Sequence, residues 1–371
     1  MDIKNVSYEV TQNCNFRCKY CYVLKYAKKG SVETGKAVID WLLRSEISGR
    51  DTRTVRINFF GGEPLLAMDV ITGMVDYAKL LNCDSLKKVR FSMTSNLSLL
   101  TPEIMTYFKD NNINLLASID GDKETHDKHR VLPDGGSTWG LVYPAAQLLV
   151  KNQTATTARM TVSLDTASKM FDNVRFLVED MGFTNVAPTP DTDNAVWSPE
   201  YIEILSNEYF KLEQWIVDRI HKNTPNAICI RYFSKTIGLL LKDKKMSRPC
   251  GAGRGYWGIS YDGGIYPCHR FASYPEWRLG DVFIGDIDYS KVQGMIDRDN
   301  RKSEKCKSCN IHYCGGGCYA SNYVRNKDIT VIGHDACELR RLLERTGQNI
   351  INKCWSTDCF RNLFLNKGGK V

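Results

Sequence analysis

The sequence lacks the features of an exported, membrane-bound or nucleic-acid-binding protein. No apolar run approaches the length of a membrane span, and residues 1–4 lead into a strand-like segment instead of a signal peptide. The net charge is +8, but no run of five basic residues occurs. We therefore expect a cytoplasmic protein without a membrane anchor or a nucleic-acid partner.

Cysteine, in contrast, is abundant, with 14 residues in a chain of 371. A protein without an export signal stays in a reducing compartment, where disulfides do not persist. Metal ligation explains the cysteines better. A composition of 43% hydrophobic and 25% charged residues is typical of a folded globular protein with a large core.

Three of the cysteines, Cys14, Cys18 and Cys21, lie within eight residues, shortly after the strand-like segment 6–10. Each iron of a [4Fe-4S] cluster takes one external ligand, so three thiolates leave one iron open to a group that is not protein. Open metal positions are where chemistry occurs. A zinc loop, or three unrelated thiols, is the alternative.

Strand-like and helix-like segments alternate after this loop. The expected strands are 54–60, 88–94, 113–119, 158–164 and 185–188, and the expected helices are 32–43, 66–81, 102–109, 139–151, 169–181 and 198–219. Six βα units predict a parallel sheet with helices outside and ligands at the carboxyl ends of the strands. The composition changes after Ile228, and we place a domain boundary near Phe233.

Gly61-Gly62-Glu63-Pro64 follows the second predicted strand. Two glycines let a ligand approach the backbone, and the adjacent carboxylate can accept a hydrogen bond from an ammonium group. A tight turn that ends at Pro64 is the alternative.

Further polar residues follow the next two strands. Thr94 and Asn96 end the third strand, Ser118 ends the fourth, and His126-Asp127 and Arg130 come soon after. Hydroxyls and a guanidinium group suit a ribose and a carboxylate. Each of these residues could instead be a turn former or a helix cap.

A second group of cysteines lies in the last third of the chain. Its members are Cys250, Cys268, Cys306, Cys309, Cys314, Cys318 and Cys337. Residues 261–268 predict a small β-hairpin closed by Asp-Gly, and glycines 315–317 suit the positive φ angles that a backbone wrapped on a cluster needs. A zinc ribbon has two C-x2-C pairs, but this region has one pair and seven thiols.

The two cysteine patterns and the GGE motif resemble those of the radical S-adenosylmethionine (SAM) enzymes that carry a SPASM domain. The resemblance implies a partial (β/α)6 barrel over residues 1–233, and a small Cys-rich SPASM domain with a C-terminal helix over 234–371. It implies SAM and three [4Fe-4S] clusters as cofactors, with Cys14, Cys18 and Cys21 on the cluster whose open iron binds SAM. The SAM contacts that it implies are Tyr20, Gly61, Gly62, Glu63, Thr94, Asn96, Ser118 and Arg130.

The resemblance also divides the later cysteines. Auxiliary cluster I takes Cys250, Cys268 and Cys318, and auxiliary cluster II takes Cys306, Cys309, Cys314 and Cys337. Four residues separate Cys309 from Cys314, where the family usually has five. The fourth ligand of auxiliary cluster I stays open between a substrate thiolate, an exogenous group, and Cys229, Cys354 or Cys359.

The function that the resemblance implies is modification of a ribosomally made precursor peptide. A 5′-deoxyadenosyl radical from SAM abstracts a hydrogen from a peptide carbon, and a thiolate or an aromatic ring captures the carbon radical as a thioether or carbon-carbon cross-link. The remaining electron leaves through the auxiliary clusters, and a flavodoxin or ferredoxin supplies the reducing electron. The sequence does not separate these cross-links from epimerisation, and it names neither the peptide nor the oligomeric state.

Two alternatives remain at this point. Anaerobic sulfatase-maturing enzymes share the architecture but place an Asp directly after the hairpin cysteine, where this chain has His269 and Arg270. These two residues are our catalytic candidates; His269 could act as a base near pH 7 or hydrogen-bond to cluster sulfide. The other alternative is a non-enzymatic metal-binding or electron-transfer module.

Many peptide maturases place a winged-helix leader-binding domain before the barrel, whereas this sequence begins at the first strand. We therefore expect a separate leader-binding protein, or a surface such as the loop 190–199 with Asp191, Asp193 and Trp197. An ordinary loop is the alternative for this segment.

Overall fold

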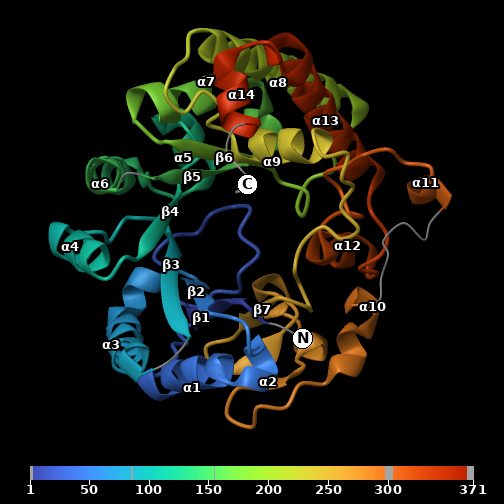
Figure 1. The fold of residues 1–371 in the computed structure, drawn as a ribbon. Helices are drawn as coiled ribbons and strands as arrows, with labels where there is room; N and C mark the ends of the chain where they lie inside the picture. Colours follow the sequence, from blue (N-terminus) through green and yellow to red (C-terminus); the bar gives the residue numbers. More distant parts are fainter. Residues whose placement is uncertain (1–2, 85–86, 154, 297–303, 366–371) are drawn as a thin grey trace. The chain divides into compact units, whose positions relative to one another are not determined.

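The computed structural model describes residues 3–84, 87–153, 155–296 and 304–365, which form two compact units (Figure 1). Unit 1 comprises Met1–Ser118, His126–Thr156 and Cys250–Arg298, and unit 2 comprises Ile119–Thr125, Thr157–Pro249 and Asp299–Val371. The division into residues 1–233 and 234–371 stays a prediction. No helix in the described part of the chain has the length and apolar character that a membrane span requires.

Unit 1 is built on a parallel sheet. The strands β1 (Asn5–Thr11), β2 (Thr54–Gly61), β3 (Lys88–Ser95) and β4 (Asn114–Ser118) pair in parallel in this order. On the other edge of β1 lies the parallel strand β7 (Tyr256–Ile259), followed by the antiparallel strands β8 (Gly264–Tyr266) and β9 (Gly280–Asp281). The turn at Asp262-Gly263 is as predicted, but the hairpin begins at Tyr256, before the predicted range 261–268, because β7 was not expected. The pairing of β7 with β1 puts the Cys250–Arg298 segment into unit 1.

One face of this sheet is apolar and the other is polar. Residues such as Val55, Ile57 and Phe59 of β2 are buried and alternate with Arg56 and Asn58. The helices of unit 1 are α1 (Val32–Leu43), α2 (Ser45–Ser48), α3 (Met68–Asp84), α4 (Pro102–Asp110), α6 (Trp139–Asn152) and α10 (Gln293–Ile296), and the unit boundary falls within α5 (Lys123–His129). Thr101 caps α4 as predicted, because its hydroxyl accepts a hydrogen bond from the Ile104 N–H.

Unit 2 pairs the parallel strands β5 (Thr157–Val162) and β6 (Asn185–Pro190) and packs a group of helices together (Figure 1). These helices are α7 (Met170–Arg175), α8 (Pro199–His221), α9 (Arg231–Leu240), α11 (Glu304–Lys307), α12 (Tyr319–Asn326), α13 (His334–Cys354) and α14 (Asp358–Phe364). The predicted helix 169–181 is divided, because α7 continues into a π-helical segment, Phe176–Asp180. Trp197, Phe233 and Phe360 are fully buried in this unit.

Candidate functional site

The first cysteine loop leaves β1 and is fixed at both ends by backbone hydrogen bonds. Before Cys14, the Gly62 N–H donates to the Thr11 carbonyl at 2.8 Å, and the Glu63 N–H donates to the Asn13 carbonyl at 2.8 Å. Further along the loop, the Arg17 N–H donates to the Val131 carbonyl at 2.7 Å. The carboxyl end of β2 and the segment after α5 therefore hold the loop in place.

The glycine pair permits this contact. Gly61 has a φ of +137°, and a Cβ there would lie 2.1 Å from the Thr11 carbonyl oxygen. A Cβ on Gly62 would lie 2.1 Å from the Asn13 carbonyl oxygen. Because no side chain fits at these distances, the two glycines serve the close approach of the cysteine loop itself.

Glu63 is a buried carboxylate at this edge, with only 1% of its surface exposed. Its Oε1 accepts from the Ser95 hydroxyl at 2.7 Å and the Leu65 N–H at 3.1 Å, and its Oε2 accepts from the Asn96 N–H at 2.7 Å. Burial raises the pKa of Glu63 to about 7 despite these bonds. Three donors fix the carboxylate and leave acceptor capacity on Oε2.

Asn96 joins the end of β3 to the cysteine loop. Its Nδ2 donates to Asn15 Oδ1 at 3.0 Å, Asn15 Nδ2 donates to Ser98 Oγ at 2.8 Å, and the Ser98 hydroxyl donates back to Asn96 Oδ1 at 2.6 Å. Asn15 lies between two of the predicted cluster ligands. This ring of three side chains therefore positions the loop against the sheet, a role that the sequence pattern did not reveal.

After β4, some of the polar residues hold the chain in place, and another is a candidate for contact with SAM. Asp127 accepts from the Thr138 and Trp139 N–H groups at the start of α6, and buried His126 hydrogen-bonds to Thr138 Oγ1 at 3.1 Å. Asp127 therefore satisfies N–H groups at the start of α6, and His126 is a core residue. Arg130 instead lies over the Tyr20 ring, with 5.4 Å from Cζ to the ring centroid.

The remaining predicted SAM contacts, Thr94 and Ser118, are half-buried at the ends of β3 and β4. All the residues predicted to contact SAM belong to unit 1, and the parallel register of β2, β3 and β4 brings the ends of these strands to one edge. Their roles toward SAM stay predictions.

His269 lies in an aromatic group that also belongs to unit 1. Its ring centroid is 4.5 Å from that of Phe60 and 6.2 Å from that of Tyr22, and the Arg270 guanidinium lies 5.0 Å from the Tyr22 ring centroid. The Tyr256 hydroxyl and His269 Nδ1 form a short hydrogen bond. We call Tyr22, Phe60, Tyr256, His269 and Arg270 the His269 group. It brings both catalytic candidates together beside Cys21 and Cys268.

A chain of polar side chains crosses the sheet to reach this group. The Ser92 hydroxyl of β3 donates to Asn58 Oδ1 of β2 at 3.1 Å, and Asn58 Nδ2 donates to Ser7 Oγ of β1 at 3.5 Å. The Tyr256 hydroxyl of β7 lies 2.7 Å from Ser7 Oγ and also contacts His269. Polar residues at single positions of otherwise apolar strands could have predicted this series of hydrogen bonds across the sheet.

Cys250 and Cys268 lie at the two ends of the β7–β8 segment. The Gly253 N–H donates to the Pro267 carbonyl at 3.0 Å, which joins the loops that follow Cys250 and precede Cys268. Gly258 of β7 lies beneath the Cys268–His269 backbone, because a Cβ there would be 2.4 Å from the Cys268 carbonyl carbon. Cys318, the third predicted ligand of auxiliary cluster I, belongs to unit 2, so this ligand set stays a prediction.

The four cysteines predicted for auxiliary cluster II all belong to unit 2, and α13 carries one of them. Cys337 lies in the first turn of α13, and Glu344 lies two turns later on the same face of the helix. Glu344 accepts from the His312 N–H at 2.7 Å, His312 Nδ1 at 2.7 Å and the Tyr313 N–H at 3.2 Å. It thereby ties the segment before Cys314 to the helix that carries Cys337.

Glycines 315–317 have φ angles of +64°, +90° and +79°, as predicted for the turn between Cys314 and Cys318. Two candidates for the open ligand position are less suitable. Cys229 and Cys354 are fully buried, and burial raises the pKa of each thiol to about 11, which disfavours the thiolate. Cys359 is only partly buried.

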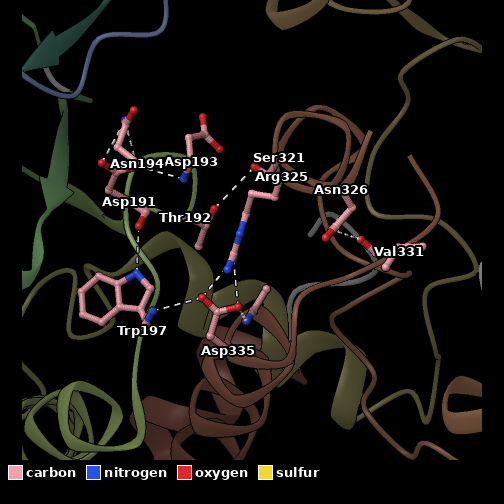
Figure 2. Close-up of polar contacts among 11 residues, drawn as sticks. Asp191, Thr192, Asp193, Asn194, Trp197, Ser321, Arg325, Asn326, Val331 and Asp335 are labelled. Carbon is pink, nitrogen blue, oxygen red and sulfur yellow. Dashed lines mark hydrogen bonds and ion pairs between the residues drawn. The ribbon is translucent and has the colours of Figure 1, made fainter. Parts of the chain in front are cut away.

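Figure 2 shows that the loop after β6 is an ordinary, well-bonded loop. Trp197 is 2% exposed, its indole N–H donates to the Asp191 carbonyl at 2.8 Å, and its backbone N–H donates to Asp335 Oδ2 at 3.1 Å. The Arg325 guanidinium donates to both Asp335 oxygens at 2.9 Å. Trp197 therefore does not present an aromatic surface for a leader peptide, and Asp335 braces the start of α13.

Among the described residues, no three Cys, His, Asp or Glu side chains converge on a position for a single metal ion. The thiols of the described cysteines are free of disulfides. The cysteine loop, with its fixed backbone and three thiols outside any disulfide, has the ligand chemistry that an iron-sulfur cluster needs. The ligand sets of the three clusters stay predictions.

Comparison with known proteins supports the resemblance to the radical SAM enzymes. Residues 8–177 match the family model of the Radical SAM superfamily. The radical SAM cyclopropyl synthase TigE of Paramaledivibacter caminithermalis is 22% identical over 360 residues, covering 92% of this chain and 73% of TigE. The cysteine-type anaerobic sulfatase-maturating enzyme of Clostridium novyi is 25% identical over 332 residues, covering 83% of this chain and 85% of that enzyme.

The solved structure of native anSMEcpe with bound AdoMet and Cp18Cys peptide has a TM-score of 0.78 and 20% identity, covering 95% of this chain and 99% of that one. This likeness confirms the predicted mixed α/β fold with the parallel sheet of a partial barrel. The family implies that SAM and a [4Fe-4S] cluster are cofactors. The family model and the related enzymes agree with the cysteine motif: residues 8–177 form a radical SAM domain, and most of this chain is similar to radical SAM enzymes.

Proposed function

We propose that this protein modifies a ribosomally made precursor peptide, removing a hydrogen from a peptide carbon and installing a thioether or carbon-carbon cross-link. The observation that carries the proposal is the placement of the His269 group within unit 1, the unit that also holds the cysteine loop and Glu63. Aromatic walls beside a fixed imidazole suit a peptide side chain. The peptide bound to anSMEcpe gives the class of substrate.

We assign the cofactor-binding roles to residues of unit 1. Cys14, Cys18 and Cys21 hold the SAM cluster, and the remaining acceptor capacity of Glu63 takes the SAM ammonium. Arg130 and the polar ends of β3 and β4 hold the carboxylate and ribose of SAM. Bound there, the two cofactors supply hydrogen-atom abstraction from an unactivated carbon.

The His269 group orients the peptide and moves protons. Phe60 and Tyr22 offer flat apolar surfaces to the residue being modified. His269, held through Nδ1 by Tyr256, presents its other ring nitrogen to accept the proton that leaves when the cross-link forms. Arg270, over Tyr22, fixes the peptide backbone or a carboxylate.

The auxiliary cysteines complete the proposal. Cys250, Cys268 and Cys318 hold auxiliary cluster I, and Cys306, Cys309, Cys314 and Cys337 hold auxiliary cluster II, for a total of three [4Fe-4S] clusters. A reduced flavodoxin or ferredoxin supplies electrons, and a separate protein presents the leader peptide. Described cysteines without disulfides suit the reducing cytoplasm.

Formation of formylglycine in a sulfatase is the second candidate, because the C. novyi relative is named for it. The two candidates differ at the residue after Cys268, which is His269 in this chain. A sulfatase-motif peptide that gains a hydrazide-reactive aldehyde would establish maturation. Loss of two hydrogens from a peptide, without an aldehyde, would establish cross-linking.

The experiment that tests the cofactor set is an anaerobic count of iron, sulfide and zinc per chain, in the wild type and in a Cys14/Cys18/Cys21→Ala variant. We expect about twelve irons, falling to about eight in the variant, because each [4Fe-4S] cluster contributes four. Stoichiometric zinc with little sulfide would reject the proposal.

A further inference from the structure

Glu9 is a buried carboxylate on the face of the unit 1 sheet that carries the His269 group. It pairs in register with Phe60 across β1 and β2, so the two side chains leave the same face. Ser7, two residues earlier on β1, faces the same way, because it hydrogen-bonds to Asn58 and Tyr256. The proposed function gives no role to Glu9.

Around Glu9, the hydrogen-bond acceptors outnumber the hydrogen-bond donors. Glu9 is 5% exposed, and among the described residues its carboxylate receives one hydrogen bond, from Gln12 Nε2 to Oε2 at 3.2 Å, and forms no ion pair. Gln12 is 8% exposed, and its Oε1 is buried with no hydrogen-bond partner among the described residues. A buried oxygen without a donor is a position that a water or a donor group of a ligand can fill.

The negative charges around Glu9 indicate which kind of ligand group would bind there. Burial and, to a smaller extent, the negative charge of Asp262 raise the pKa of Glu9 to about 7, although the Gln12 hydrogen bond lowers it. A cation beside the carboxylate would offset both unfavourable effects. One carboxylate and one amide oxygen are too few ligands for Ca²⁺ or Mg²⁺. A peptide N–H has a single donor and no charge, whereas a primary ammonium has three donors and a positive charge.

Resting on the proposed function, we propose that Glu9 and Gln12 bind the side-chain ammonium of a lysine in the peptide substrate. The ammonium donates to the free carboxylate oxygen of Glu9 and to Gln12 Oε1. Phe60, which lies beside Glu9 on this face, packs against the methylene stem of the lysine. The lysine then fixes the register of the peptide next to the His269 group.

The test is affinity selection with the reconstituted holoenzyme and SAM. Two N-acetylated random peptide libraries share one design, free of other basic residues, with a central lysine in one and Nε-acetyl-lysine in the other. Retained peptides are quantified by mass spectrometry for the wild type, Glu9→Gln, Gln12→Leu and the control Glu203→Gln, which changes an exposed carboxylate of α8. Circular dichroism and the iron count verify that each variant is folded.

We expect the wild type and Glu203→Gln to retain the lysine library at least tenfold over the acetylated one. Glu9→Gln and Gln12→Leu should each bring this ratio close to one, so either folded variant suffices. Equal retention by the wild type, an unchanged ratio in the variants, or retention of neither library overturns the inference. Formation of 5′-deoxyadenosine by the same wild-type preparation under dithionite is measured in parallel, and its absence rejects the proposed function separately.

Discussion

Among single residues, Glu9 should make the stability of the fold depend on pH. Burial, and to a lesser extent Asp262, raises its pKa from an ordinary value of 4.5 to about 7 in the folded chain. Its protonated form therefore stabilises the fold, an effect that is complete below pH 4.5 and is lost as the pH rises through 7. Between pH 6 and 8.5 we expect the wild type to lose ~1 kcal/mol more unfolding free energy than Glu9→Gln. Anaerobic denaturant unfolding measures this difference, and a pH-independent gap would contradict it.

Tyr256 is a single residue that positions the His269 ring. Its hydroxyl contacts both Ser7 Oγ and His269 Nδ1. Tyr256→Phe removes this support and frees the imidazole to rotate. We expect peptide modification to slow by about tenfold to a hundredfold, since positioned proton transfer contributes at least that much. The measured quantity is modified peptide per 5′-deoxyadenosine formed, with Tyr261→Phe in the neighbouring turn as the control. An unchanged ratio would remove Tyr256 from the site.

Among the secondary-structure elements, α13 carries Cys337 of the predicted auxiliary cluster II and, through Glu344, holds the segment before Cys314. Glu344 accepts three hydrogen bonds from His312 and Tyr313, and each bond to a charged acceptor contributes roughly 1.5–3 kcal/mol. Glu344→Ala should therefore loosen the loop of Cys309 and Cys314 and speed the release of about four irons to a chelator by at least roughly tenfold. Glu203→Ala on α8 is the matched control. Identical release from the two variants would show that α13 does not support the cluster.

The sequence was informative about elements whose pattern is local. Residues 32–43 form a helix with the predicted bounds, and the strands 54–60 and 88–94 differ from β2 and β3 by one residue. In contrast, β7 has only four residues, and its pairing with β1 is set by tertiary contacts about 250 positions apart in the chain. The same limit hid Tyr256, because a tyrosine in a short strand has no pattern of its own.

The sequence pointed to candidate site residues where ligand-type side chains occur at a characteristic spacing, as in the three-cysteine loop and at Glu63. Its supporting residues were not, because Asn15, Ser95 and Ser98 are ordinary turn-forming types until the fold brings them together. His126 is a polar residue whose surroundings the sequence did not reveal. It stands near the predicted ligands, but the structure buries it against Thr138.

For the whole molecule, the proposed roles divide between the two units. The residues assigned to SAM and the His269 group belong to unit 1, whereas the auxiliary cluster II cysteines belong to unit 2. Cleavage of SAM should therefore not need the unit 2 cysteines. Modification of the peptide, a two-electron oxidation in the proposed reaction, should need the complete set of clusters.

Cys337→Ala separates these two requirements. We expect the iron count to fall from about twelve to about eight, because one [4Fe-4S] cluster loses a ligand in the first turn of α13. The 5′-deoxyadenosine formed under dithionite without peptide should stay within about twofold of the wild type, because a difference of ~0.4 kcal/mol is the most expected between sites without shared partners. Peptide product should disappear. Cys229→Ala, which removes a buried thiol, is the control for cysteine loss itself, and it should retain all the iron and the product. If Cys337→Ala abolishes SAM cleavage as well, the two units do not act independently, and the assignment of SAM chemistry to unit 1 alone is wrong.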